Sequence, residues 1–258
     1  MKYSRRLKAE NVGLVENQAF DFTWRQHFLT YATMKKFCDE KGNIFTFNKS
    51  SEILSHAKLK RNEPGAVSVR GWTQEVEKDI SHPIENRYLE VIDKLINTTT
   101  IVLSSSDNSA VLEYLALWSA RFKYRNNDGL EFSYGNWPRQ RLNLFQKQCL
   151  EQRKTHQAGT MQEHEYNSLY VKSLLKEIVK DLRGIHLSIH RIKCNLNLVL
   201  PDKTNLLCIP VSSNIVLLPR ECYFDGSSPS SVSKLNWDIM NQSHEYFWVK
   251  DISKVLFL

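Results

Sequence analysis

Residues 171–200 read Val171-Lys-Ser-Leu-Leu-Lys-Glu-Ile-Val-Lys-Asp-Leu-Arg-Gly-Ile-His-Leu-Ser-Ile-His-Arg-Ile-Lys-Cys-Asn-Leu-Asn-Leu-Val-Leu200, and their hydrophobic spacing changes at Gly184. Before this glycine, apolar residues recur at helical spacing on one face, which predicts a helix over about 161–183. After it, apolar and polar residues alternate, which is typical of strands. The alternation moves from odd to even positions near His190 and predicts a bulge or turn there.

Helical signals dominate the sequence upstream of this change. We expect helices over about 21–38, from Pro83 onward, over about 109–125 and over about 138–156. In this part of the chain the clearest strand pattern is the alternation in residues 43–49.

Strand signals dominate downstream. Residues 209–211, 215–218 and 245–249 are further strand candidates, and the Ser-rich stretch 226–233 predicts a flexible surface loop. Because helices come first and strands later, the sequence predicts an α+β fold. Its N-terminal two thirds should be mostly helical, with a smaller, mainly antiparallel sheet toward the C-terminus.

The length and composition are those of an ordinary globular protein. The chain has 258 residues, of which 41% are hydrophobic and 24% charged. We expect a single α+β domain over residues 1–258. Within it, residues 1–20 would form a loosely structured arm, residues 21–184 a mainly helical part and residues 185–258 a strand-rich part.

Charge and cysteine content suggest partners and compartment. The net charge of +7 suits an acidic partner, either nucleic acid or an acidic protein surface. The five cysteines are scattered without C-x-x-C spacing, so we predict neither disulfides nor structural zinc. The basic start of the chain leads into no apolar run, and no stretch reaches the roughly 18 apolar residues of a membrane span. The expectation is a cytoplasmic protein with no membrane association.

Sequence motifs identify no cofactor and no metal site. The chain lacks the glycine-rich nucleotide loops, the H-E-x-x-H zinc motif and the G-x-S-x-G nucleophile motif. His186, His190 and Cys194 are spaced four apart, which would share one face of a helix. Because the local pattern is that of a strand, we interpret the histidines as solvent-facing residues of an edge strand. The sequence predicts no oligomeric state.

Several short segments resemble a mainly bacterial family of domains of unknown function, whose signature is His-Tyr-Val-Pro followed by Leu-x-x-Phe. The matching segments, in chain order, are His27-Phe-Leu-Thr-Tyr-Ala-Thr-Met-Lys-Lys-Phe37, Asp39-Glu-Lys-Gly-Asn-Ile-Phe-Thr-Phe-Asn-Lys49, Ile84-Glu85, Leu115-Ala-Leu-Trp-Ser-Ala-Arg121-Phe-Lys-Tyr-Arg125 and Ile209-Pro210-Val-Ser212. Thr30 stands where the family has proline. Leu200-Pro-Asp202-Lys replaces an expected Ser-Asp-Asn-Pro turn. The resemblance implies a mostly helical fold with a late sheet and no established activity.

His27, Glu85 and Arg121 are the candidate catalytic residues. Each lies on a separate predicted helix, and three packed helices could bring an imidazole, a carboxylate and a guanidinium into one cleft. Such a set combines a general acid or base with an anion clamp, as phosphodiester hydrolysis requires. The structural alternative is a buried salt bridge between Glu85 and Arg121, with His27 bonded to a backbone carbonyl.

A basic stretch from residue 121 to 154 is the candidate nucleic-acid interface. Cations that neutralise phosphates alternate there with rings that can stack on bases. The residues predicted to make these contacts are Arg121, Lys123, Arg125, Trp137, Arg139 and Arg141. The alternative is that these are solvated helix ends whose aromatic residues belong to the core.

Two hypotheses for function follow. The first is a nucleic-acid-acting, nuclease-like effector in bacterial or phage conflict. The second is a non-catalytic binding or regulatory module that contacts RNA, DNA or an acidic protein surface.

Overall fold

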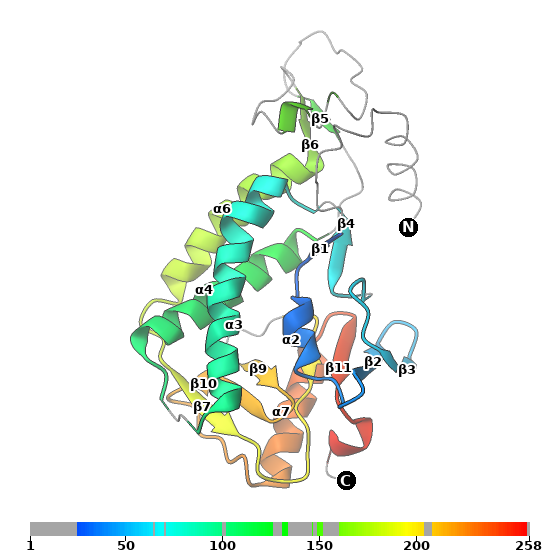
Figure 1. Cartoon of the computed structure of the whole chain (residues 1–258), viewed down its shortest axis with the longest axis vertical. Coiled ribbons are helices and arrows are strands. Elements are labelled where there is room, and N and C mark those ends of the chain that lie inside the picture. Colours follow the sequence, from blue (N-terminus) through cyan, green and yellow to red (C-terminus); the bar gives the residue numbers. More distant parts are fainter. Residues whose placement is uncertain are drawn as a thin grey trace.

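The computed structural model describes residues 25–63, 65–69, 71–99, 102–125, 131–133, 146, 149–151, 160–203 and 208–256 (Figure 1). The elements, in chain order, are β1 (Arg25–His27), α2 (Tyr31–Lys35), β2 (Asn43–Asn48), β3 (Ile53–Lys58), β4 (Val67–Val69), the π-helix η2 (Val76–Ser81), α3 (His82–Asn97), α4 (Ser105–Lys123), β5 (Glu131–Ser133), β6 (Thr160–Gln162), α6 (Glu163–Asp181), β7 (Leu187–Arg191), β8 (Leu200–Pro201), β9 (Ile209–Ser212), β10 (Ile215–Pro219), α7 (Pro229–Gln242), β11 (Tyr246–Val249) and the 3-10 helix η3 (Ile252–Lys254). In the described part of the chain, no helix has the length and apolar character to cross a membrane. The predicted arm, residues 1–20, lies outside it.

The described strands form four antiparallel sheets. Two are pairs, β1-β4 and β5-β6, one has the order β7-β10-β9, and the largest has the order β3-β2-β11-β8. In the largest sheet Phe47 lies opposite Phe247, so residues from the two ends of the described chain are neighbours in one sheet. Their rings stack with centroids 5.0 Å apart.

The chain has both helices and sheets, but the predicted placement of the sheet was wrong. Strands are distributed along the chain, and the largest sheet takes β2 and β3 from its first part and β8 and β11 from its last. Residues 25–27, 67–69 and 160–162 are strands too short to show a period of two. In β3 every residue is exposed, so its sequence lacks the alternation of buried and exposed positions that identifies a strand.

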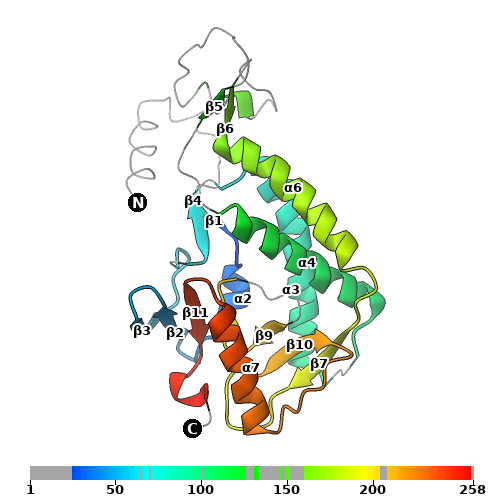
Figure 2. The same cartoon turned by 180° about the vertical axis from the view of Figure 1, so that it is seen from behind.

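Helices α3, α4 and α6 pack together on the side of the molecule away from the largest sheet (Figures 1 and 2). Helices α3 and α4 meet through Tyr88 and Tyr114, whose rings stack with centroids 3.7 Å apart. Trp118 of α4 is fully buried, and its indole N–H donates to the carbonyl of Asp202, 3.2 Å away. The predicted helices near residues 83–97, 109–125 and 161–183 are therefore confirmed as α3, α4 and α6. The predicted helix over 138–156 falls almost entirely outside the described residues.

Asp202 fixes the approach of β11 to β8. Its carboxylate is buried and accepts the backbone N–H groups of His244, Glu245 and Tyr246 at 2.8, 2.8 and 3.0 Å. Three donors converging on one carboxylate satisfy a charge that would otherwise be costly to bury. Asp202 stands in the Leu-Pro-Asp-Lys segment, which the family resemblance marked as a departure.

Two local predictions near the C-terminal sheets were wrong. Residues 229–233, expected in a surface loop, begin helix α7, because Ser228 caps its N-terminus and Pro229 suits its first turn. The expected strand over 192–200 forms only at Leu200–Pro201. The chain turns after Arg191. Leu198 is fully buried, and its N–H donates to the carbonyl of Ser213 outside any strand pairing.

Helix α4 begins with a capping box. The Ser104 hydroxyl accepts the N–H of Asp107, and the Asp107 carboxylate accepts the N–H of Ser104. Lys94 of α3 donates to the same carboxylate at 2.6 Å. This hydrogen bond, together with the bonds from Ser104, lowers the pKa of Asp107 below its ordinary value despite partial burial.

We expect Asp107→Asn to lower the free energy of unfolding at neutral pH by about 1 kcal/mol, because it removes a capping charge and the bond to Lys94. The pKa of Asp107 is lower in the folded state than in the unfolded state. Its contribution is therefore complete above the unfolded value and is lost as the pH falls through the folded value. Urea denaturation from neutral to acidic pH should show the difference between wild type and variant shrinking toward zero. Asp93→Asn, at an exposed pair with Lys36, is the control. A difference that does not change with pH would contradict this assignment.

Candidate functional site

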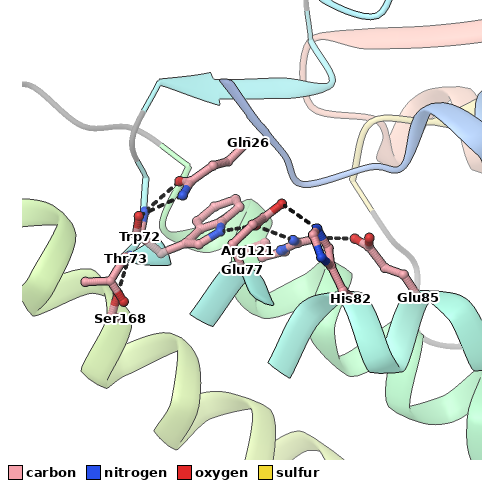
Figure 3. A network of polar contacts seen from close by, with 8 residues as sticks. All are labelled: Gln26, Trp72, Thr73, Glu77, His82, Glu85, Arg121 and Ser168. Atoms are coloured by element: carbon pink, nitrogen blue, oxygen red, sulfur yellow. Dashed lines mark hydrogen bonds and ion pairs between the residues drawn. The ribbon is translucent and has the colours of Figure 1, made fainter. Parts of the chain in front are cut away.

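Arg121 is the centre of a buried polar network. Helix α4 places its side chain inside the protein with 0% exposure. One terminal nitrogen donates to Glu77 at 2.8 Å, and the other donates to Glu85. Burial alone lowers the pKa of an arginine, but Glu85 and Glu77 outweigh that effect and raise the pKa of Arg121. The guanidinium therefore stays charged and ties α4 to η2 and α3 (Figure 3).

A π-helical turn positions the first of these carboxylates. Residues 76–81 form η2, which continues directly into α3, and the N–H of His82 donates to the carbonyl of Glu77 five residues earlier. This wider turn brings the side chains of Glu77 and His82 together, with Nε2 and Oε1 3.7 Å apart. His82 is half exposed, so it is the solvent-facing member of the network. Single π-turns within helices are uncommon and are often found at functional sites.

Trp72 and Gln26 hold Glu77 from the other side. The indole N–H of Trp72 donates to Glu77 at 2.7 Å, and the guanidinium of Arg121 lies over the Trp72 ring, 4.9 Å from its centroid. Gln26 pairs with the Trp72 backbone, since its amide donates to the carbonyl at 2.8 Å and its oxygen accepts the N–H at 3.0 Å. Both side chains are fully buried.

The network continues to α6 through Thr73. The backbone N–H of Thr73 donates to the Ser168 hydroxyl at 2.7 Å, and that hydroxyl in turn donates to the carbonyl of His164, also at 2.7 Å. Ser168 is buried and so is engaged in holding α6 against the 72–73 segment (Figure 3). The Ser168 hydroxyl therefore links α6 to the 72–73 segment and is not a free nucleophile.

The predicted catalytic residues come together only in part. Glu85 and Arg121 form the buried salt bridge, whereas the Nε2 atom of His27 lies 2.7 Å from the carbonyl oxygen of Arg61. His27 follows Gln26 on β1, and successive side chains of a strand point to opposite faces. Because Gln26 points into the network, His27 points away from it. This geometry matches the structural alternative, in which Glu85 and Arg121 form a buried salt bridge and His27 bonds to a backbone carbonyl.

Sequence reasoning missed six members of the network: Gln26, Trp72, Thr73, Glu77, His82 and Ser168. One signal was available, because Glu77 and Glu85 are two helical turns apart and lie along one helix face. Gln26 and Trp72 gave no signal, since their contact joins segments that are 46 residues apart in sequence.

The candidate nucleic-acid residues occupy three different environments. Arg121 is buried and cannot reach a phosphate. Lys123 is exposed, and its ammonium lies 5.7 Å from the centroid of the Tyr124 ring. Arg125 is half-buried over the Phe122 ring, 3.8 Å from its centroid, and donates to the Phe122 carbonyl. Trp137, Arg139 and Arg141 lie outside the described residues.

Three tyrosines form a continuous ring surface at the end of α4 and the beginning of α6. We name Tyr124, Tyr166 and Tyr170 the tyrosine surface. The Tyr170 ring lies 5.6 Å from that of Tyr124 and 4.5 Å from that of Tyr166, measured between centroids. Tyr166 and Tyr170 are 37% and 41% exposed, and their hydroxyls share a 2.8 Å hydrogen bond. The bond from Tyr166 to Tyr170 raises the pKa of Tyr166, and partial burial raises that of Tyr124.

Neither a metal centre nor a known relative identifies the activity. Among the described residues, no three or more His, Cys, Asp or Glu side chains are grouped to hold a metal ion. Comparison with protein-family models, curated proteins and solved structures finds no match to this chain. The structure defines an α+β protein in which the buried polar network around Arg121 joins the helices.

We expect Arg121→Met to lower the free energy of unfolding by about 3–5 kcal/mol, because it leaves two carboxylates buried without their cation. Adding Glu77→Gln and Glu85→Gln to the same chain should recover a large part of this loss, since the unpaired charges disappear. Urea denaturation measures both effects.

The control is Arg87→Met, which breaks the exposed pair with Glu113. This change should cost at most about 1 kcal/mol. If Arg121→Met were no more destabilising than the control, the network would not carry the structural role assigned to it.

Proposed function

We propose that this protein binds single-stranded nucleic acid on the tyrosine surface. Lys123 and the Lys and Arg residues of segment 126–159 would contact the phosphates. The observation that carries the proposal is the run of three contacting tyrosine rings, two of which are substantially exposed. The rings are tilted by 40° and 47° to one another, and their exposed parts are aromatic surface on which unpaired bases can stack, whatever the base.

A cation stands beside the rings. Lys123 lies over the Tyr124 ring and is exposed, so its ammonium is available to a phosphate near the stacked bases. Leu169, one position before Tyr170 on α6, is 54% exposed and adds apolar surface near the rings. Stacking area and positive charge are therefore present on one surface, as single-strand binding requires.

The distribution of charge along the sequence supports the same surface. Among the described residues, Lys and Arg nearly balance Asp and Glu, so most of the net charge of +7 comes from the rest of the chain. Residues 126–159 contribute +2 of this net charge, from five Lys or Arg and three Asp or Glu, and they connect α4 to α6, the two helices that bear the tyrosine surface. Strands β5 and β6 pair Ser133 with Thr160 and so bring part of this connection to the start of α6.

A nuclease-like activity built on His27, Glu85 and Arg121 receives less support from the geometry. The guanidinium is engaged by two carboxylates, and His27 contacts a carbonyl on the opposite face of β1. Binding without cleavage is therefore the function proposed, and cleavage is an outcome of the same experiment.

We expect the double change Tyr166→Ala and Tyr170→Ala to raise the dissociation constant for a labelled single strand by at least about tenfold, because one stacked base contributes about 1–3 kcal/mol. Tyr166→Phe with Tyr170→Phe should bind close to wild type, since the rings remain. Tyr223→Ala, at a tyrosine that is 96% exposed outside the surface, is the matched control. Fluorescence anisotropy with RNA and DNA strands, single and duplex, at two salt concentrations measures the constants.

Equal affinity of the alanine variant and wild type would overturn the proposal. Binding that an acidic polypeptide abolishes, while the aromatic changes have no effect, would instead indicate an acidic protein as the partner. Strand cleavage that is lost in His27→Ala, with unchanged thermal stability, would reinstate the enzymatic hypothesis.

A further inference from the structure

Strand β3 is an exposed edge of the largest sheet. It hydrogen-bonds to β2 on one side, and no described residue pairs with its other side. All six of its residues are exposed, and Ile53 and Leu54 retain 60% and 46% of their accessible surface. The outward backbone groups of such an edge are ready to bond to another strand.

The strand lacks the features by which proteins usually protect an edge. Proteins shorten an edge strand, bulge it, or place charges and proline along it. The opposite edge of this sheet, β8, has only two residues. In contrast, β3 pairs with β2 over six consecutive positions without a register shift and contains neither proline nor glycine. Its one Lys or Arg, Lys58, lies at its end.

We propose that β3 pairs with β3 of a second copy of this chain, antiparallel about a two-fold axis at Ser55. Every second residue of β3 bonds to β2, and the residues between them direct their N–H and C=O groups outward. Only these outward-directed residues can bond to a second copy, so they must lie opposite one another across the two-fold axis. A symmetric pairing therefore places one residue opposite itself. With Ser55 at that position, residues 53–57 of the two copies lie opposite one another, and Lys58 lies beside the turn residue Glu52 of the other copy.

The charges and side chains of β3 match in this register. Glu52 precedes β3 in the β2–β3 turn with a positive φ, so it flanks the ladder beside Lys58 of the other copy, and opposite charges meet at both ends of the contact. Between them, Ile53 meets Ala57, Leu54 meets His56 and the two Ser55 hydroxyls meet each other. Opposite charges and apolar pairs directly across an antiparallel ladder each stabilise the pairing.

Self-pairing explains this edge better than an unrelated extended peptide does. An arbitrary peptide would satisfy the backbone groups, but only a second copy in this register supplies the opposite charge at both ends. The two views place β3 on the side of the molecule away from α6, so the contact leaves the tyrosine surface free (Figures 1 and 2). This inference does not depend on the proposed function.

The test is sedimentation velocity of the full chain over a range of protein concentrations. Wild type should pass from monomer to dimer as the concentration rises. Glu52→Lys alone, or Lys58→Glu alone, should raise the dissociation constant by about tenfold or more, because two attractive pairs become repulsive. The chain with both changes should dimerise like wild type, since it exchanges the two charges and keeps both pairs attractive.

Mixing the two single variants gives a sharper result. Every end pair in the mixed dimer joins opposite charges, so the mixture should dimerise while each variant alone remains monomeric. Lys41→Glu, an exposed change outside β3, is the control for net charge, and melting temperatures verify that each variant is folded. A wild type that stays monomeric at all concentrations, or a dimer whose dissociation constant the β3 changes do not alter, would overturn the proposal.

Discussion

The buried guanidinium of Arg121 is the constraint on which the arrangement of the helices depends. It removes one cation and two carboxylates from water, which is tolerable only because hydrogen bonds from three elements meet there. The π-turn of η2 brings Glu77 into reach, and Trp72 fixes it from the opposite side. Through Gln26 and Ser168 the same group of bonds reaches β1 and α6. The helical side of the molecule is thus organised by directional polar contacts as well as by apolar packing.

The sequence identified the elements whose pattern is long enough to have a period. Helices α3, α4 and α6 each show apolar residues at helical spacing, and β2 alternates over six residues. Three-residue strands such as β1 carry too little pattern to be distinguished from a helix end. The pairing of β2 with β11 could not be foreseen either, because nothing in either strand specifies a partner some 200 residues away.

The same limit decided how much of the polar network was foreseen. Glu85 and Arg121 were selected as polar residues of the segments that carry the family resemblance, and both lie on well-patterned helices. His27 was grouped with them because residues 21–38 were interpreted as one helix, whereas the structure has a strand that ends at His27 and a short helix that begins at Tyr31. In a strand its side chain points to the face opposite Gln26. Because this strand was interpreted as part of a helix, His27 rather than Gln26 was assigned to the network.

The sheet β3-β2-β11-β8 has a consequence for synthesis of the chain. The hairpin β2–β3 is complete once residue 58 has been made, but its partner β11 is translated only after α3, α4, α6 and α7. Until then both edges of the hairpin are open on the ribosome. The helices, whose contacts are more local, can form while the hairpin waits. Emergence of residues 246–249 is therefore the step that gives β2 its second neighbour, and until then β2 is unpaired on that side.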